Sequence, residues 1–298
     1  MIRADNVTMK FGDFTALNSL CCDIPDSCIY GLVGSNGAGK STFLRLISGV
    51  YRPYSGEITV DGEKIYENPE IKSKIMYVPD ELYFLPQSNM KEMARFYSAI
   101  YKSFSFQRFD ELTSTFGLDK KANINTFSKG MKRQAATILA LSVMPKYLFF
   151  DETFDGLDPV MRNLVKQVIY NDVLERGTTT IITSHSLREL EDTCDQLALL
   201  HKGGIAFESD IQNLKTALFK VQIAFGDEYG RERFEGIEIL NYRQLGSVSD
   251  LIVRGDKEEI VAKLKAMSPL IIDVLPLNLE EVFIYEMEAL GYAFKDIL

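Results

Sequence analysis

The sequence predicts an α/β protein built around a phosphate-binding loop, and three observations support this fold class. A glycine-rich stretch, Gly34 to Thr42, lies between an apolar strand pattern and a helical pattern. A later apolar run ends in two carboxylates, Asp151 and Glu152. Short apolar runs alternate with helical periodicity along most of the chain, which is typical of a sheet covered by helices.

The composition is that of an ordinary globular protein. The chain has 298 residues, 46 % of them hydrophobic and 25 % charged, which allows one large domain or a main domain with a small one. The net charge of -9 argues against a general nucleic-acid binder, so no nucleic-acid partner is expected. No apolar run reaches the roughly 18 residues of a membrane span, and residues 1–5 do not form an apolar signal segment.

The cysteines show neither the spacing of metal ligands nor that of a disulfide framework. We therefore expect buried thiols in a protein of the reducing cytosol. The residues concerned are Cys21, Cys22, Cys28 and Cys194.

The stretch from Gly34 to Thr42 has the glycines, the lysine and the hydroxyl residues of a phosphate-binding loop. Gly34, Gly37 and Gly39 are expected to adopt positive φ angles, so that the loop amides form a concave nest for an anion. Lys40 can reach the β- and γ-phosphates of a nucleotide, and the Ser41 hydroxyl can ligate Mg²⁺. A chance glycine-rich turn is the alternative, and the flanking strand and helix argue against it. The predicted ATP-binding residues of the loop are Gly34, Ser35, Asn36, Gly37, Ala38, Gly39, Lys40, Ser41 and Thr42.

The elements before the middle of the chain follow from alternation and turn residues. An antiparallel strand set is predicted from Met1 to about Leu32, with turns at 11–13 and 25–27. Phe11 precedes the first turn; it could be core packing, but its place upstream of a nucleotide loop favours stacking on adenine. The helix after the loop should end at Gly49, and further strands are predicted at 55–60 and 74–78.

The periodicity then becomes helical and predicts a helical subdomain over about 85–145. Asn89 can cap its first helix together with Glu92, and Gly117 would end the second. Beyond it, strands are predicted at 147–151, 178–183, 194–200 and 205–207, with a helix over 159–175. Mixed strands and helices then predict a small α+β domain, which divides the chain into domains 1–210 and 211–298.

Two strand ends carry candidate catalytic residues. Asp151 would hold Mg²⁺ directly or through water, and Glu152 would act as general base on the attacking water. A strand that ends in two acids could instead be a solvated turn, but the phosphate-binding loop makes this alternative weaker. His185 follows the strand over 178–183; ligands bind beyond the carboxyl ends of parallel strands, so His185 could contact a γ-phosphate. A structural role is the alternative for this histidine.

The segment from Phe127 to Gln134 places a small hydroxyl and a glycine, Ser128 and Gly130, just before an apolar helix. This combination can bind an anion at a helix start. A plain helix cap at Ser128 explains the segment equally well.

In this order, the segments resemble those of the nucleotide-binding subunit of an ATP-binding-cassette (ABC) transporter. The loop from Gly34 resembles the phosphate loop of that family, and residues 149–152 resemble its acidic strand. The segment 127–131 resembles the signature segment, Gly156-Leu157-Asp158 the dimer-contact loop, and His185 the switch histidine. Phe11 falls where the family places an adenine-stacking aromatic. The resemblance covers about 1–210; residues 279–283 resemble a C-terminal extension of bacterial exporter ATPases.

The resemblance implies an ATPase that uses ATP and Mg²⁺ and drives a separate membrane-spanning transporter subunit from the cytoplasmic face of the membrane. It implies that Ser128 and Gly130 complete the ATP site of a second ABC ATPase in trans, in a homodimer or a heterodimer. A soluble ABC ATPase that acts on ribosomes or DNA is one alternative, and a regulatory subunit with little hydrolysis is another. The transported substrate and the direction of transport stay open.

The sequence departs from the family pattern at a few positions. Asp80 stands where the family usually has glutamine after a strand; it can still ligate Mg²⁺, and we expect its main role to be coupling to the membrane partner. The signature segment has Lys129 and Met131 where glycine and glutamine are usual, and Lys129 could add a positive charge near the γ-phosphate or point to solvent. Tyr83 and Phe84 are expected to form a partner surface, with inward packing as the alternative.

Overall fold

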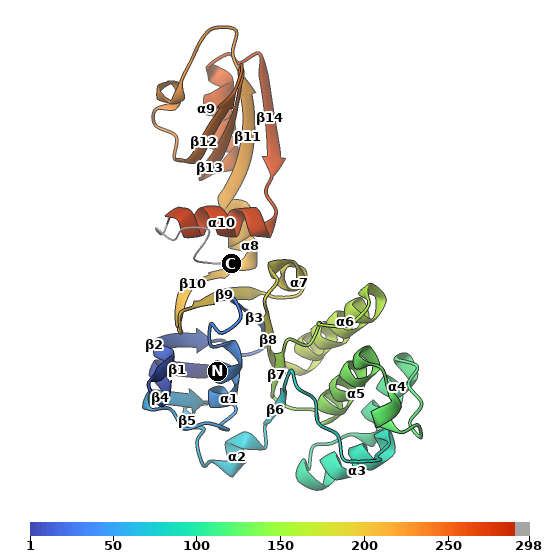
Figure 1. The fold of residues 1–298 in the computed structure, drawn as a ribbon. Helices are drawn as coiled ribbons and strands as arrows, with labels where there is room; N and C mark the ends of the chain where they lie inside the picture. The colour runs from blue at the N-terminus through green and yellow to red at the C-terminus, as the bar shows by residue number, and fades with distance from the viewer. Residues whose placement is uncertain (290–298) are drawn as a thin grey trace. The chain divides into compact units, whose positions relative to one another are not determined.

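The computed structural model describes residues 1–289, which form two compact units, one over residues 1–208 and one from Ser209 onward. Figure 1 shows their secondary structure. The sequence places the boundary near the same point, after residue 210.

The first unit is built on a six-stranded sheet with the order β10-β9-β3-β8-β7-β6. The pairs β6–β7, β7–β8, β8–β3 and β3–β9 are parallel, so these strands end at the same edge of the sheet. All residues of β3, β7 and β8 are buried, which explains why they are continuous apolar or small-residue runs rather than alternating ones. The strands are β3 (Ile29–Val33), β6 (Ile75–Val78), β7 (Tyr147–Asp151), β8 (Thr179–Ser184), β9 (Gln196–His201) and β10 (Gly204–Asp210).

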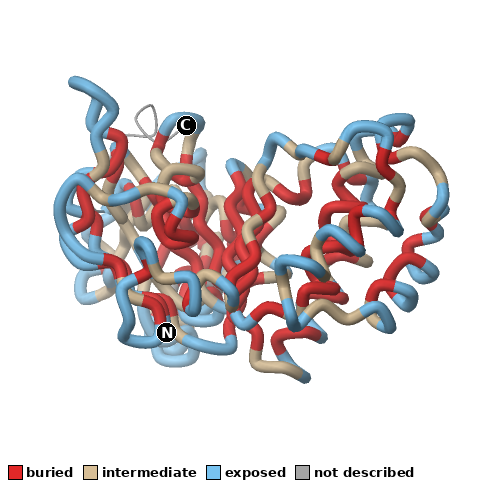
Figure 2. Tube along the Cα trace, turned by 90° about the horizontal axis from the view of Figure 1, so that it is seen from below, coloured by how far each residue is buried: buried red, intermediate tan, exposed pale blue. Residues whose placement is uncertain are grey.

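A second, antiparallel sheet of this unit has the order β2-β1-β4-β5. Helix α1 (Lys40–Ile47) packs on β2 and β4 of this sheet and on β7 of the central sheet. Contact on two sides buries most of α1 and fixes the position of Lys40 at its first residue. Figure 2 colours each residue along the Cα trace by how far it is buried. The strands of the second sheet are β1 (Ile2–Phe11), β2 (Phe14–Ile24), β4 (Ser55–Val60) and β5 (Glu63–Lys64).

The predicted helical segment is present and its caps are as expected. Asn89 and Glu92 form a reciprocal capping box at the start of α3, with bonds of 3.1 and 2.9 Å, and Gly117 follows α4 with a φ of 68°. One expectation is wrong: α5 begins at Lys129, so Gly130 lies inside the helix and not ahead of it. The helices are α3 (Met90–Ile100), α4 (Phe106–Thr115), η1 (Ile124–Thr126) and α5 (Lys129–Ser142), followed by α6 (Pro159–Arg176) and α7 (Leu187–Glu191); α2 (Pro69–Lys72) precedes them.

The second unit is an antiparallel sheet, β12-β13-β11-β14, with helices. Its core joins the strands to α9 through Phe219, Leu251 and Leu264. This mixture of strands and helices agrees with the α+β class predicted from the sequence, although the short helix α8 was not predicted. The elements are α8 (Ile211–Ala217), β11 (Leu218–Ala224), η2 (Arg231–Phe234), β12 (Ile239–Leu245), β13 (Val248–Arg254), α9 (Lys257–Ala266), β14 (Ile271–Pro276) and α10 (Leu279–Ala289).

All four cysteines are free thiols, but Cys21 is exposed, so the expectation of burial is wrong for this residue. Burial raises the pKa of Cys22 and of Cys28 to about 12, so both thiols stay protonated at neutral pH. Among residues 1–289, no helix combines the length and apolar character needed to cross a membrane.

Candidate nucleotide-binding site

The glycine-rich loop connects β3 to α1, and its glycines are required for different reasons. Gly37 and Gly39 have φ angles of 82° and 112°, as expected for a loop whose amides point inward. The expectation of a positive φ is wrong for Gly34, which is not among the positive-φ residues. A Cβ atom on Gly34 would lie 2.5 Å from the carbonyl oxygen of Leu200, so glycine is needed there because the neighbouring strand is too close.

Gly39→Ala is expected to destabilise the fold by roughly 2–4 kcal/mol, whereas Gly37→Ala should cost about 1 kcal/mol. Both substitutions strain a left-handed residue. Only at Gly39 would the new Cβ also collide with the chain, at 2.7 Å from Leu17 Cδ2 and 2.9 Å from the Ala16 carbonyl, whereas Gly37 has open space. Urea unfolding of both variants without nucleotide measures the difference. Equal losses would show that the contact with Leu17 and Ala16 relaxes at no cost.

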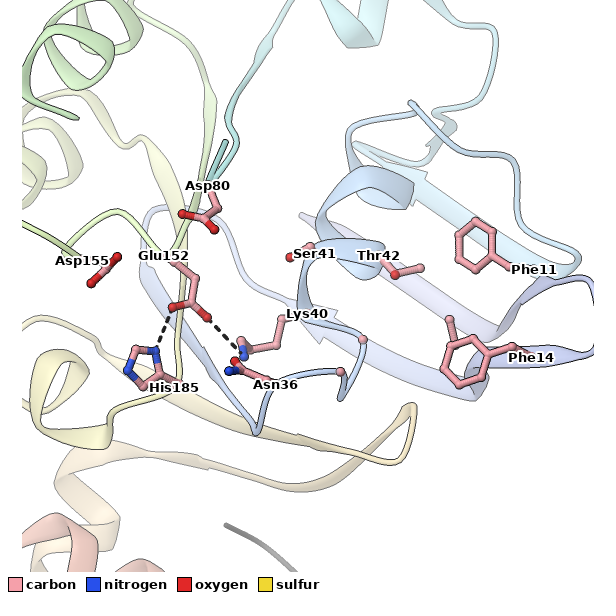
Figure 3. Close-up of a pocket in the computed structure, with 13 residues that line it drawn as sticks. Phe11, Phe14, Asn36, Lys40, Ser41, Thr42, Asp80, Glu152, Asp155 and His185 are labelled. Carbon is pink, nitrogen blue, oxygen red and sulfur yellow. Dashed lines mark hydrogen bonds and ion pairs between the residues drawn. The ribbon is translucent and has the colours of Figure 1, made fainter. Parts of the chain in front are cut away.

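Lys40 is the cationic centre of the site. Its side chain is only 6 % exposed, and Nζ donates to the carbonyl oxygens of Gly34 at 2.7 Å and Ser35 at 3.3 Å. Nζ also lies 3.3 Å from Glu152 Oε1, as Figure 3 shows. The carbonyl oxygens of the loop therefore hold the ammonium group in place, next to the loop amides that would bind a phosphate.

Glu152 is held between two polar groups at the end of β7. Its second oxygen, Oε2, lies 2.8 Å from His185 Nδ1 (Figure 3), and its backbone N–H donates to the Thr183 hydroxyl at 3.1 Å. Its φ of 53° is unusual for a residue other than glycine, and backbone strain of this kind is often found at functional sites. The structure thus brings together Lys40, Glu152 and His185, which are far apart in the sequence.

Asp151 lies behind these groups and is 1 % exposed. It accepts hydrogen bonds from the Thr183 hydroxyl at 2.8 Å and the Tyr77 hydroxyl at 3.1 Å. Burial, and then the charge of Asp151, raise the pKa of Tyr77, so its hydroxyl stays a donor. Asp151 is not among the residues that line the cavity in front of Glu152.

A cavity of about 560 Å³ lies in front of the loop, within the range of small-molecule sites. Lys40, Glu152 and His185 lie at one end, and Phe11 and Phe14 at the other (Figure 3). The two phenylalanines are 44 % and 62 % exposed, so both can stack on a planar group. Sequence reasoning missed Phe14, although it stands just after the same turn as Phe11. The lining residues are Phe11, Phe14, Ala16, Asn36, Gly37, Gly39, Lys40, Ser41, Thr42, Asp80, Glu152, Asp155 and His185.

Comparison with known proteins agrees with this geometry. Residues 17–155 match the ABC transporter family. The ABC transporter ATP-binding protein YtrB of Bacillus subtilis (strain 168) is 32 % identical over 285 residues, which are 95 % of this chain and 97 % of the relative. The chain belongs to the ABC transporter ATP-binding proteins. It is therefore an ATPase subunit that powers transport by a separate membrane-spanning partner, and the comparisons favour this role over that of a ribosome- or DNA-acting ATPase.

Two further similarities extend the comparison. The Nod factor export ATP-binding protein I of Rhizobium etli is 31 % identical over 298 residues, covering 95 % of this chain and 92 % of the relative. A dimeric ATP-binding cassette solved in a post-hydrolysis state with ADP and Pi superposes with a TM-score of 0.64 at 22 % identity. That match covers 71 % of this chain and 99 % of the cassette, and it shows the common fold.

In this ABC subunit the signature segment does not line its own cavity. Ser128 is the N-cap of α5 and accepts a hydrogen bond from the Met131 N–H at 3.2 Å, so the plain-cap interpretation describes its local role. Lys129 is largely exposed, and its Nζ lies 2.6 Å from Asp155 Oδ2. This hydrogen bond lowers the pKa of Asp155. Asp155 is a cavity residue that sequence reasoning did not single out.

The ABC subunit fits a nucleotide with Mg²⁺. Asn36, Ser41 and Thr42 of the loop line the cavity, whereas Ser35 and Ala38 shape the loop by a 3.1 Å backbone bond. Oxygen donors of the kind that Mg²⁺ prefers line the cavity at Ser41, Asp80 and Glu152, and the buried Asp151 carboxylate lies behind them.

Tyr83 and Phe84, in the loop after Asp80, behave differently. Tyr83 is 76 % exposed, whereas Phe84 is 9 % exposed and belongs to the core. The expectation of a partner surface is therefore wrong for Phe84 and stays a prediction for Tyr83.

Proposed function

We propose that this chain binds ATP and Mg²⁺ in the cavity in front of the loop and hydrolyses ATP with Glu152 as general base. The observation that carries the proposal is the position of Glu152, which lies between the Lys40 ammonium and the His185 ring at the phosphate end of the cavity. Ser41, Asp151 and Asp80 would hold Mg²⁺, which neutralises phosphate charge when bound. The adenine would lie at the other end, against Phe11.

The residues divide the chemistry between them. Lys40 and the loop amides hold the phosphates, so Lys40 must exchange its contact with Glu152 for a phosphate oxygen. The released Glu152 carboxylate accepts a proton from water as the water oxygen attacks the γ-phosphorus and the bond to the β–γ bridging oxygen breaks. His185 is placed to contact the γ-phosphate from beside Glu152.

The assembly is the second part of the proposal. Ser128 and Gly130 do not line the cavity of their own chain, which supports a role at the ATP site of a second ABC ATPase. We infer a homodimer or heterodimer that binds peripherally at the cytoplasmic face of the membrane and drives an exporter-type membrane subunit. The Nod factor export protein, similar over most of its length, supports the direction of transport.

Glu152→Gln is expected to form a homodimer when ATP and Mg²⁺ are added and to remain monomeric with ADP. The amide blocks proton transfer, so ATP stays intact between the two chains. Size-exclusion chromatography with light scattering measures the state. Ser128→Arg in the same background should stay monomeric, because the larger side chain would occupy the partner's phosphate position. A monomer at saturating ATP and high protein concentration would exclude a stable homodimer and favour a heterodimer.

A further inference from the structure

Among the fully buried side chains that the structure describes, that of Arg133 is the largest, and only 2 % of its surface is exposed. It lies in α5 and points to the loop after β6. Its Nη1 donates to the carbonyl oxygens of Asp80 at 2.8 Å and Pro79 at 3.3 Å, and its Nη2 donates to the Asp80 carboxylate. Its Nε has no hydrogen-bond partner. The hydrogen bonds of this buried cation within residues 1–289 therefore all go to Pro79 and Asp80.

Asp80 and Arg133 differ in how much each needs the other to compensate its charge. The Asp80 side chain is 55 % exposed and lines the nucleotide cavity, so water can solvate it without Arg133. Arg133 has no such access, and a buried charge without its partner is strongly unfavourable. A displacement of the Asp80 carboxylate would leave the buried guanidinium with only its bonds to the Pro79 and Asp80 carbonyls and without a counter-ion, which favours a joint movement of Arg133 and α5. A neutral glutamine at position 80 could not compensate this charge.

A second ion pair joins the same helix to the same cavity. Lys129 and Arg133 are four residues apart and lie on one face of α5, and their partners Asp155 and Asp80 both line the cavity. The Lys129–Asp155 pair is exposed, with 69 % and 46 % of the side chains accessible, and such pairs open at little cost. Of the two ion pairs, the buried Arg133–Asp80 pair is therefore the one that can transmit a displacement of a cavity residue to α5.

We propose that Arg133 is a positioning residue that fixes Asp80 in the cavity and transmits its displacement on nucleotide binding to α5, whose N-cap is Ser128. Asp80 lines the cavity, so a bound triphosphate with Mg²⁺ would change the electrostatic environment of its carboxylate. The inference rests on nucleotide binding in this cavity, as proposed above. It assigns to Arg133 a role that the sequence alone does not indicate.

The test is hydrogen–deuterium exchange of the full chain with and without saturating ATP and Mg²⁺, under conditions where light scattering shows a monomer. In the wild type, nucleotide should change exchange in the first turns of α5 by about fivefold or more. Arg133→Met should reduce this change to less than about twofold, and Arg133→Lys, which keeps the charge, should restore part of it. Nucleotide occupancy is measured in each sample.

Arg108→Met is the matched control. Arg108 of α4 binds Asp172 of α6 at 2.8 Å, and Asp172 keeps Arg176 at 2.8 Å when Arg108 is removed. This variant removes an arginine–aspartate contact outside the cavity and should retain the full response of α5. An undiminished response in Arg133→Met would overturn the inference, as would an equal loss in Arg108→Met. Absence of nucleotide binding in the wild type would instead overturn the proposed function.

Urea unfolding tests whether Arg133 depends on Asp80 more than Asp80 depends on Arg133. Asp80→Asn should lower the urea midpoint more than Arg133→Met, because only the former leaves a buried charge unpaired. Adding Arg133→Met to Asp80→Asn should then raise the midpoint again. A midpoint of the double variant below that of both single variants would show that Arg133 is adequately compensated without Asp80, and would overturn the proposed link.

Discussion

Glu152→Gln is expected to lower kcat for ATP hydrolysis by about 100- to 10,000-fold, the usual range for loss of a general base. Glutamine keeps the shape of the side chain but cannot accept a proton from water. The contact with His185 can persist, because the ring can donate from Nδ1 to the amide oxygen in place of Oε2. Phosphate release at saturating ATP and Mg²⁺ measures the loss.

The same variant should bind ATP at least as tightly as the wild type. Glu152 Oε1 lies 3.3 Å from Lys40 Nζ and competes with phosphate for this cation, and the substitution removes the competing charge. Glu189 provides the control: it follows β8, accepts a hydrogen bond from the Ser184 hydroxyl at 2.6 Å and does not line the cavity. Glu189→Gln should therefore hydrolyse ATP at close to the wild-type rate. Wild-type turnover in Glu152→Gln would remove Glu152 from the proposed chemistry.

The sequence was sufficient for the features that are encoded locally. The loop, the strand that ends in Asp151 and Glu152, and the capping box of α3 each depend on residues a few positions apart. The parallel sheet then follows because buried strands separated by helices must pair with their carboxyl ends at one edge. This edge brings Glu152 and His185 together, which is why the main site residues could be named before their geometry was known.

The features that were missed depend on contacts between distant segments. Nothing near Arg133 in the sequence marks it as buried or as the partner of Asp80, because this pairing requires α5 to pack beside the loop after β6. The need for glycine at position 34 likewise comes from Leu200, a residue of a neighbouring strand. Helices α2, α7 and α8 were missed for another reason, since each is too short to show helical periodicity.

Lys40→Met is expected to weaken ATP binding by about 100-fold, because charge-assisted hydrogen bonds of roughly 1.5–3 kcal/mol are lost. The structure adds a second reason: without Lys40, the Glu152 carboxylate loses a cation 3.3 Å away and repels the triphosphate. Adenosine has no phosphate, so its affinity should hardly change. Equilibrium titration with ATP and with adenosine separates the two effects. Lys146→Met is the control, since Lys146 contacts Asp61 at 2.7 Å and neither residue lines the cavity.

The double variant Lys40→Met/Glu152→Gln decides between the two reasons for the loss. If repulsion by Glu152 contributes, removing both charges should recover about tenfold in ATP affinity relative to Lys40→Met alone, which corresponds to about 1.4 kcal/mol. If only the lost hydrogen bonds matter, the double variant and Lys40→Met should bind ATP equally. An ATP affinity of Lys40→Met close to the wild-type value would contradict both reasons and would place the phosphates elsewhere. The recovery is expected because the structure places Glu152 within 3.3 Å of the ammonium group that phosphate must also reach.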